Sequence, residues 1–310
     1  MLGPAPSTLA ASAHNWPAVA SRGIQELMGS GDRSPVGWDS RTGLWGGSSA
    51  PHWWQSGLAV LTLVRYAHRT GNVTPSIHNV LIRTYQLNRA NAGPNHQSNF
   101  TDRFFDDTGW WALAWLAAAQ YELLDRHDQL DASRFLLVAE SDATYIARQP
   151  HACGGIAWGT GYGPDTITDA EFVTLTSELA QFRQTAGPLR NPKLASQWLA
   201  DARNTWSWLK GSGLINLSTG EVAKDGMTPG SCQLRGGPVT YTQGEVAEAL
   251  IQLGLALRDS SYYAPAEAFL RYATDPANGF IHDGVLQDHC EPESPNCQAL
   301  DTRLDVTAFK

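Results

Sequence analysis

One segment of this sequence is apolar on every face of a helix, and it constrains the fold more than any other feature. The run from Trp110 to Leu116 reads Trp-Trp-Ala-Leu-Ala-Trp-Leu and contains no polar residue. A helix that is apolar all round is buried all round, because none of its faces suits water. We therefore predict a helix over about residues 107–124 that lies enclosed by other helices.

Two neighbouring carboxylates, Asp106 and Asp107, stand directly before this run. Asp107 suits the N-cap, where its side chain would accept a hydrogen bond from a backbone N–H. Two acids so close cannot both ionise freely, and the helix N-terminus and the nearby indoles would drive their pKa values further apart. One ionised and one protonated carboxyl is what glycoside hydrolysis uses, and neighbouring Cβ atoms about 5–6 Å apart suit a retaining pair.

The alternative interpretation of the two acids is purely structural. Asp107 would be an ordinary N-cap and Asp106 would pair with Arg103, since capping explains most acids at the start of a helix. For two aspartates alone this interpretation is favoured, so the surrounding sequence decides between the two.

Helical periodicity continues along the chain, whereas the alternation of β-branched residues that marks strands is nearly absent. The second, fourth, sixth and eighth predicted helices are the more apolar ones, which is what a double ring of helices requires. We predict an all-α fold, an (α/α)6 barrel in one domain over residues 1–310, with a helical bundle as the alternative. Loops that enter the inner helices would share one face and form the active-site groove. The predicted helices cover about residues 7–29 with a break at Pro17, 53–69, 75–88, 107–124, 131–148, 169–186, 191–210, 241–258 and 262–273.

Charge and aromatic content narrow the class of ligand. The net charge of −8 argues against nucleic acid and anionic membrane surfaces as partners, and no stretch approaches the roughly 20 apolar residues of a membrane span. Core packing needs few of the 12 tryptophans, so we expect some to line a groove. The candidates for stacking against sugars are Trp45, Trp54, Trp110 and Trp158, although each alone is more often a core residue. Tyr241 and Gln243 are candidates for hydrogen bonds to sugar hydroxyls, with capping or core packing equally expected.

The four cysteines form neither a CxxC pair nor a zinc-finger spacing with histidine. A disulfide could close the loop between Cys290 and Cys297, and Cys153 could pair with Cys232, while buried free thiols are the alternative. The N-terminus shows no signal peptide. Either the protein is intracellular, or its leader has been left off or misannotated. We favour the second alternative and expect a secreted or cell-wall protein.

A possible metal site remains to be weighed. One loop gathers His282, Asp283, Asp288 and His289. None of these residues has the i, i+4 spacing of ligands on a helix, so a solvated loop is favoured over a metal site. We predict no metal and no other cofactor.

The residues around the aspartate pair resemble a known family. The string Asp106-Asp107-Thr-Gly-Trp-Trp-Ala-Leu resembles the signature of glycoside hydrolase family 76, the endo-α-1,6-mannanases. Less specific matches support it: Trp53-Trp54-Gln55-Ser56, Thr240-Tyr241-Thr242-Gln243-Gly244 and Cys153-Gly-Gly. The sequence departs from the family pattern where sugar subsites would lie, at Ile156, Gly159, Asp169, Phe172 and Thr242.

The resemblance implies a function and roles for the pair. Asp106 would be the nucleophile and Asp107 the acid/base of a retaining enzyme that cleaves α-1,6-mannosidic linkages in mannan. A cell-wall transglycosidase acting on mannose-containing glycans is one alternative, and a non-catalytic glycan-binding protein is another. Members of the family continue into further helices after a Phe-Lys-Gly motif. Because the sequence ends at Phe309-Lys310, we expect the last helices of the barrel to be missing.

Overall fold

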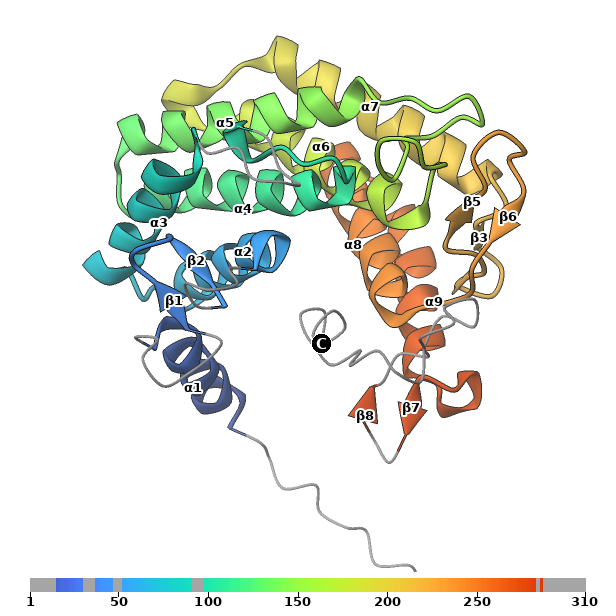
Figure 1. Cartoon of the computed structure of the whole chain (residues 1–310), viewed down its shortest axis with the longest axis horizontal. Coiled ribbons are helices and arrows are strands. Elements are labelled where there is room, and N and C mark those ends of the chain that lie inside the picture. Colours follow the sequence, from blue (N-terminus) through green and yellow to red (C-terminus); the bar gives the residue numbers. More distant parts are fainter. Residues whose placement is uncertain (1–14, 30–36, 47–51, 91–97, 283–284, 287–310) are drawn as a thin grey trace, which may run out of the picture.

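The computed structural model describes residues 15–29, 37–46, 52–90, 98–282 and 285–286. Over these residues the chain is mostly helical (Figure 1). The nine α-helices within them are α1 (Trp16–Met28), α2 (Trp53–Thr70), α3 (Pro75–Asn88), α4 (Phe105–Leu124), α5 (Gln129–Ala147), α6 (Thr166–Thr185), α7 (Pro192–Gly211), α8 (Thr240–Leu257) and α9 (Tyr263–Thr274). The prediction of an all-α chain is confirmed, and each helix predicted from periodicity has its counterpart.

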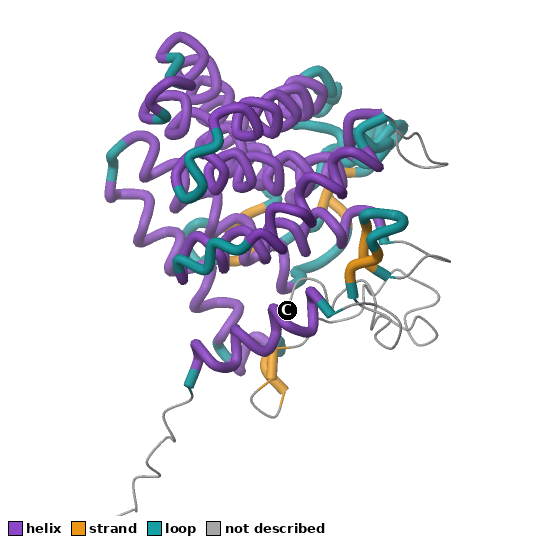
Figure 2. The backbone as a smooth tube through the Cα atoms, turned by 90° about the vertical axis from the view of Figure 1, so that its left-hand side faces the viewer, coloured by secondary structure: helices purple, strands orange, loops and turns teal. Residues whose placement is uncertain are grey.

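In the part of the chain that the structure describes, strands contribute only short antiparallel pairs (Figure 2), and each strand has two residues. These pairs are β1 (Trp38–Asp39) with β2 (Leu44–Trp45), β3 (Ile215–Asn216) with β4 (Glu221–Val222), β5 (Gly226–Met227) with β6 (Leu234–Arg235), and β7 (Ile281–His282) with β8 (Val285–Leu286). Each pair lies in a segment outside the α-helices. The strands therefore order loops and do not form a sheet layer.

The helices form a curved double layer. α2, α4, α6 and α8 contact one another in that order and make the inner layer. α5, α7 and α9 each pack on the inner helix that precedes them in the chain. Figure 1 shows the resulting arc, from α2 through α4 and α6 to α8 and α9. The predicted alternation of enclosed and half-exposed helices is therefore present.

Two helices of the inner layer, α4 and α6, differ in the kind of side chain that they bury. On α4 the side chains are apolar, and the fully buried Trp111 and Trp115 stack on each other with ring centroids 5.9 Å apart. On α6 half of the buried residues are polar, and they include Asp169, Glu171 and Ser177. Residues of α6 belong to both apolar clusters among the described residues, one around α4 and one around α8, so this helix joins the two clusters.

The start of α4 differs from the prediction. The helix begins at Phe105, its N-cap is Phe104, and that residue caps without a side chain. The N–H of Phe104 donates to Oδ1 of Asp102 at 2.9 Å, and the N–H of Phe105, the first helical residue, donates to the carbonyl of Trp158 at 2.7 Å. The prediction that Asp107 is the N-cap is wrong, and both aspartates lie inside the first turn.

Some of the residues named in the predictions lie outside the described residues. The first helix begins at Trp16, and the part predicted before residue 15 lies outside the described residues, as do Cys290, Cys297, Asp283, Asp288 and His289. Within the described residues, none of the helices has both the length and the hydropathy that crossing a membrane requires.

Candidate active site

A glycine-rich loop between α5 and α6 is fastened to the start of α4. The backbone N–H of Phe105 donates to the carbonyl of Trp158 at 2.7 Å, and that of Thr160 donates to the carbonyl of Arg103 at 3.0 Å. Glycine is needed at position 159, since a Cβ there would lie 2.8 Å from the Arg103 carbonyl oxygen. These contacts bring Trp158 against the aspartate pair from about fifty residues away in sequence.

Asp106 is half-buried and is held by an indole. Nε1 of Trp158 donates a hydrogen bond to Oδ2 of Asp106 at 3.0 Å. The other oxygen, Oδ1, is buried and has no hydrogen-bond partner among the described residues. Burial raises the pKa of Asp106 to about 6. The Trp158 hydrogen bond and the backbone N–H groups of Asp107 and Asp106 oppose that rise, and the charge of Asp102 adds to it.

Asp107 completes the pair in the same helical turn. It is also half-buried. The first turn of a helix favours negative charge through the helix dipole and the free N–H groups. The second structural alternative, an ion pair between Asp106 and Arg103, is not formed, because Arg103 is exposed and its guanidinium lies over the Phe104 ring, 4.7 Å from the centroid.

An aromatic wall stands beside Asp106. The rings of Phe104, Trp158 and Tyr162 contact one another, with centroid distances of 4.9 Å for Phe104–Trp158, 4.8 Å for Trp158–Tyr162 and 5.7 Å for Phe104–Tyr162. Tyr162 is 41% exposed, so part of the wall faces solvent. Trp158 was predicted as a stacking residue, whereas Phe104 and Tyr162 were not. The sequence offered one signal for each of them: Phe104 lies close to the aspartate pair in the chain, and Tyr162 lies between Gly161 and Gly163.

The other predicted ligands lie in different environments. Trp45 and Trp110 are each 3% exposed, and Nε1 of Trp45 donates to the carbonyl of Leu27 at 2.7 Å. These two rings pack in the core, so the prediction that they stack against sugars does not fit their burial. Trp54 opens α2 and is half-buried, as is Tyr241 in the first turn of α8. Gln243 is fully buried, and its Oε1 accepts from the Val222 N–H at 3.2 Å, which fastens β4 to α8.

Buried acids surround the pair, and sequence reasoning missed most of them. Asp165 caps α6 through the Thr168 N–H at 3.1 Å, and Oδ1 of Asp169 accepts from the Ile156 N–H of the glycine-rich loop at 3.3 Å. Burial raises the pKa of Asp165, Asp169 and Glu171 well above the ordinary values, and the charge of Asp106 adds to the shift of Asp165 and Glu171. The apolar residues of the sixth predicted helix indicated that it is enclosed, but they did not indicate that its acids are enclosed as well, because acids on a helix usually face water.

These shifts predict that the protein is most stable in mild acid. A buried acid whose pKa is raised binds more protons folded than unfolded, so stability falls as pH rises from the unfolded value near 4 through the folded value. Burial raises the pKa of Glu178 to about 7 and that of Asp142 well above its usual value. We expect the melting temperature to fall by at least about 3 °C between pH 5 and pH 8. Thermal unfolding followed by circular dichroism at constant ionic strength measures this, and a melting temperature that rises over that range would contradict it.

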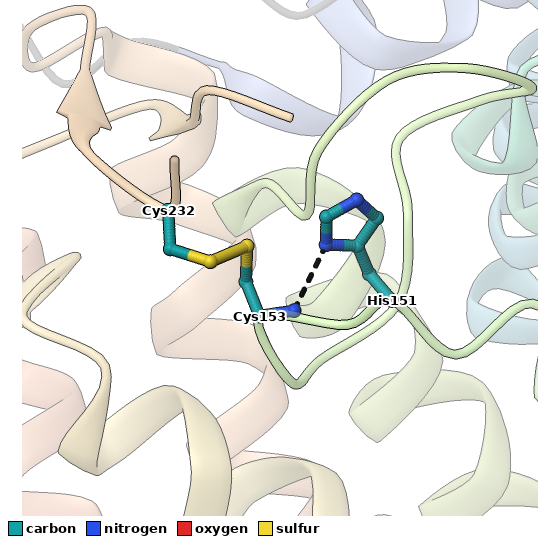
Figure 3. Close-up of a disulfide and its surroundings, with 3 residues drawn as sticks. All are labelled: His151, Cys153 and Cys232. Carbon is teal, nitrogen blue, oxygen red and sulfur yellow. Dashed lines mark hydrogen bonds between the residues drawn. A yellow bond between two sulfur atoms is a disulfide. The ribbon is translucent and has the colours of Figure 1, made fainter. Parts of the chain in front are cut away.

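A disulfide links the glycine-rich loop to the turn between β5 and β6. Cys153 and Cys232 are bonded, with Cα atoms 5.5 Å apart, and the Cys153 N–H donates to Nδ1 of His151 at 3.1 Å (Figure 3). The predicted pairing of Cys153 with Cys232 is confirmed. The loop that carries Trp158 is thus held at both ends, by the disulfide and by the start of α4.

A cluster of titratable groups also lies at the far end of α4. Donor atoms of His78, Glu122 and Asp131 lie within 4.8 Å of one another. Arg126 donates to Oε2 of Glu122 at 2.9 Å, and Arg134 pairs with Asp131. Since each carboxylate already has an arginine, the cluster is an ion-pair network that joins α3, α4 and α5.

Comparison with known proteins identifies the architecture. The sequence profile of glycosyl hydrolase family 76 matches residues 37–309. A comparison with curated protein sequences finds no match. The solved structure of an α-1,6-mannanase from Salegentibacter sp. is 20% identical, with a TM-score of 0.66 over 88% of this chain and 74% of that one. An inactive variant of it, with two consecutive aspartates replaced by alanine, was solved with α-1,6-mannotetrose and gives 19% identity and a TM-score of 0.67 over the same shares.

A second organism supplies a similar fold. An α-mannanase of the same family from Bacteroides thetaiotaomicron is 15% identical, with a TM-score of 0.61 over 86% of this chain and 73% of that chain. At these identities the likeness concerns the fold. It confirms the predicted (α/α)6-barrel architecture.

Proposed function

This chain belongs to glycosyl hydrolase family 76, and we propose that it hydrolyses α-1,6-mannosidic linkages in mannan with retention of configuration, using Asp106 and Asp107. The observation that carries the proposal is the pair itself: two half-buried carboxyl groups in the first turn of α4, one of them hydrogen-bonded to Trp158 beside a partly exposed aromatic wall. The similar fold of an enzyme that binds α-1,6-linked mannose oligomers supports the choice of linkage.

The reaction proceeds in two displacements. Asp106 attacks the anomeric carbon with one carboxylate oxygen while the bond from that carbon to the leaving oxygen breaks. Asp107 gives its proton to the leaving oxygen, so the departing sugar leaves as an alcohol. Asp107, now ionised, then takes a proton from water as the water oxygen attacks the anomeric carbon and releases Asp106. The product has the configuration of the substrate, because the carbon is inverted twice.

The surrounding residues divide into those that contact sugar and those that hold the site. Trp158 and Tyr162 present aromatic faces beside Asp106, where the C–H face of a mannose ring would stack. Trp54 and Tyr241, both half-buried at the starts of inner helices, are assigned to further sugar contacts. Gln243 holds β4 in place, so its role is structural.

The stereochemistry of the first product tests the proposal. Proton NMR of α-1,6-mannan during the earliest turnover should show new reducing ends in the α configuration before mutarotation. Reducing ends that appear first as the β anomer would overturn the retaining mechanism. Addition of an acceptor glycan separates hydrolysis from transglycosylation, since a transglycosidase would transfer the glycosyl group to the acceptor and release few reducing ends.

A non-catalytic glycan-binding protein is the alternative from another class. It would change tryptophan fluorescence on titration with α-1,6-mannose oligomers without releasing reducing ends. The carboxyl pair beside a partly exposed aromatic wall favours catalysis, because binding alone needs no carboxyl group with a pKa near 6.

We further infer that the protein works outside the cytoplasm, secreted or in the cell wall. The disulfide between Cys153 and Cys232 supports an oxidising compartment. The proposed substrate, mannan, is a polymer that the enzyme would also encounter outside the cytoplasm.

A further inference from the structure

Glu171 lies on α6 behind the aspartate pair and has no role in the reaction as described so far. It is 1% exposed, and neither of its carboxyl oxygens has a hydrogen-bond partner among the described residues. A carboxylate left in that state would cost several kcal/mol of desolvation, so the group keeps its proton. A protonated carboxyl group is a hydrogen-bond donor as well as an acceptor.

Gly109 on α4 makes the room for this carboxyl group. A Cβ atom at position 109 would lie 2.4 Å from Oε2 of Glu171, so the carboxyl end of Glu171 occupies the place where a larger residue would put its side chain. Gly109 is three residues after Asp106, and residues three apart share a face of a helix with Cβ atoms about 5–6 Å apart. Because Gly109 leaves this space empty, the carboxyl end of Glu171 lies on the face of α4 that carries Asp106, within reach of that side chain.

The charged groups that act most strongly on Glu171 are all acids. Asp106 and Asp107 act on it from α4, Asp165 from the start of α6 and Glu245 from α8. Burial first, and these charges second, raise the pKa of Glu171 well above its ordinary value, whereas that of Asp106 is about 6. Burial and the surrounding acids therefore favour the protonated form of Glu171, which can donate a hydrogen bond. On the side of Asp106, the buried Oδ1 can accept one and has no hydrogen-bond partner among the described residues.

We propose that Glu171, in its protonated form, is a positioning residue that donates a hydrogen bond to Oδ1 of Asp106, directly or through one water molecule. The proposal rests on the function proposed for Asp106. With Trp158 on Oδ2, the nucleophile would then have a donor on each oxygen, which fixes the plane of its carboxylate and favours its ionised form. A third acid in the site thus assists the nucleophile by remaining neutral.

Direct titration of Asp106 tests this without any turnover. The protein is labelled with carboxyl-13C aspartate, and Asp106→Asn identifies the Asp106 signal in a pH series. Glu171→Gln keeps a donor, so the pKa of Asp106 should stay within about 0.3 units. Glu171→Leu removes the donor, so the pKa should rise by about one unit, a tenfold change in the ionisation constant. Trp158→Phe is the positive control, because it removes the donor to Oδ2 and should shift the pKa in the same direction.

Asp142→Asn is the matched negative control. It also neutralises a buried acid, but Asp142 lies on α5 and accepts from Asn99, so the Asp106 titration should not move. An unchanged titration in Glu171→Leu, with Trp158→Phe shifted, would overturn the proposal. So would a downward shift in Glu171→Gln, since that result would mean that Glu171 carries a charge, and this arm decides the question even if the leucine variant does not fold. Failure of the proposed function is a separate result, namely full activity of Asp106→Asn.

Discussion

Replacement of Asp106 by asparagine is expected to lower the rate of α-1,6-mannan hydrolysis by about 10³-fold or more, because a neutral amide cannot form the glycosyl–enzyme ester. The fold should not suffer. Asparagine has nearly the same shape, its side-chain oxygen can still accept the hydrogen bond of Trp158, and a buried carboxyl group with a raised pKa is removed. The measurement is reducing-end release under saturating mannan, with the melting temperature as a check of folding.

Replacement of Asp107 by asparagine should give a different pattern. With mannan the rate should fall by about 10²–10⁴-fold, since the leaving sugar then departs without a proton. With an activated aryl α-1,6-mannobioside the first step should be much less affected, because a phenol of low pKa leaves without protonation. Asp106→Asn should remain inactive on both substrates. This contrast assigns the two roles, and a pKa near 6 at Asp106 alone would suit either one.

The control for both variants is Asp142→Asn, which neutralises a buried acid on α5 outside the site and should keep full activity. Two results would contradict the assignment. Full activity of Asp106→Asn and Asp107→Asn would remove the pair from the mechanism. Retention of aryl mannobioside cleavage by Asp106→Asn, but not by Asp107→Asn, would exchange the roles of nucleophile and acid/base.

The helices were predictable because their apolar residues recur with the helical period, and α4 was the clearest since it is apolar all round. Its first residue was not predictable from the same pattern. Asp107 has the chemistry of an N-cap, but the helix begins two residues before it, where the Phe105 N–H donates to the carbonyl of Trp158. Local preference names residues that can cap, and tertiary contacts choose among them.

The site was predictable in part. The aspartate pair could be found from the chain alone, because the residues that follow it, Thr-Gly-Trp-Trp-Ala-Leu, resemble the family signature. The hydrogen bond from Trp158 to Asp106 joins residues 52 positions apart, and it depends on how the glycine-rich loop folds over α4. Glu171 was missed for a further reason. Charged residues on a helix usually face water, and only the position of Gly109 opposite it shows that this one is buried.

Removal of the disulfide should destabilise the protein strongly and disturb the site less. The bond joins residues 79 positions apart, and loss of such a crosslink from the unfolded chain costs about 2–5 kcal/mol in the free energy of unfolding. The measurement is urea unfolding of Cys153→Ala with Cys232→Ala against the unreduced wild type. Reductant should lower the stability of the wild type toward that of the double variant, which serves as its control. An unchanged urea midpoint in the double variant would contradict this account of the crosslink.

The effect on activity follows from the contacts that remain. Without the disulfide the loop is still held by the Phe105–Trp158 backbone hydrogen bond and by Asp169 on Ile156. Trp158 should therefore still reach Asp106 in most molecules, and the rate on mannan should fall by less than about tenfold at a temperature where the double variant is folded. A loss as large as that of Asp106→Asn would mean that the disulfide, rather than the start of α4, sets the position of Trp158. The loss of unfolding free energy shows how far the crosslink stabilises the fold, and the loss of rate on mannan shows how far it orders the site.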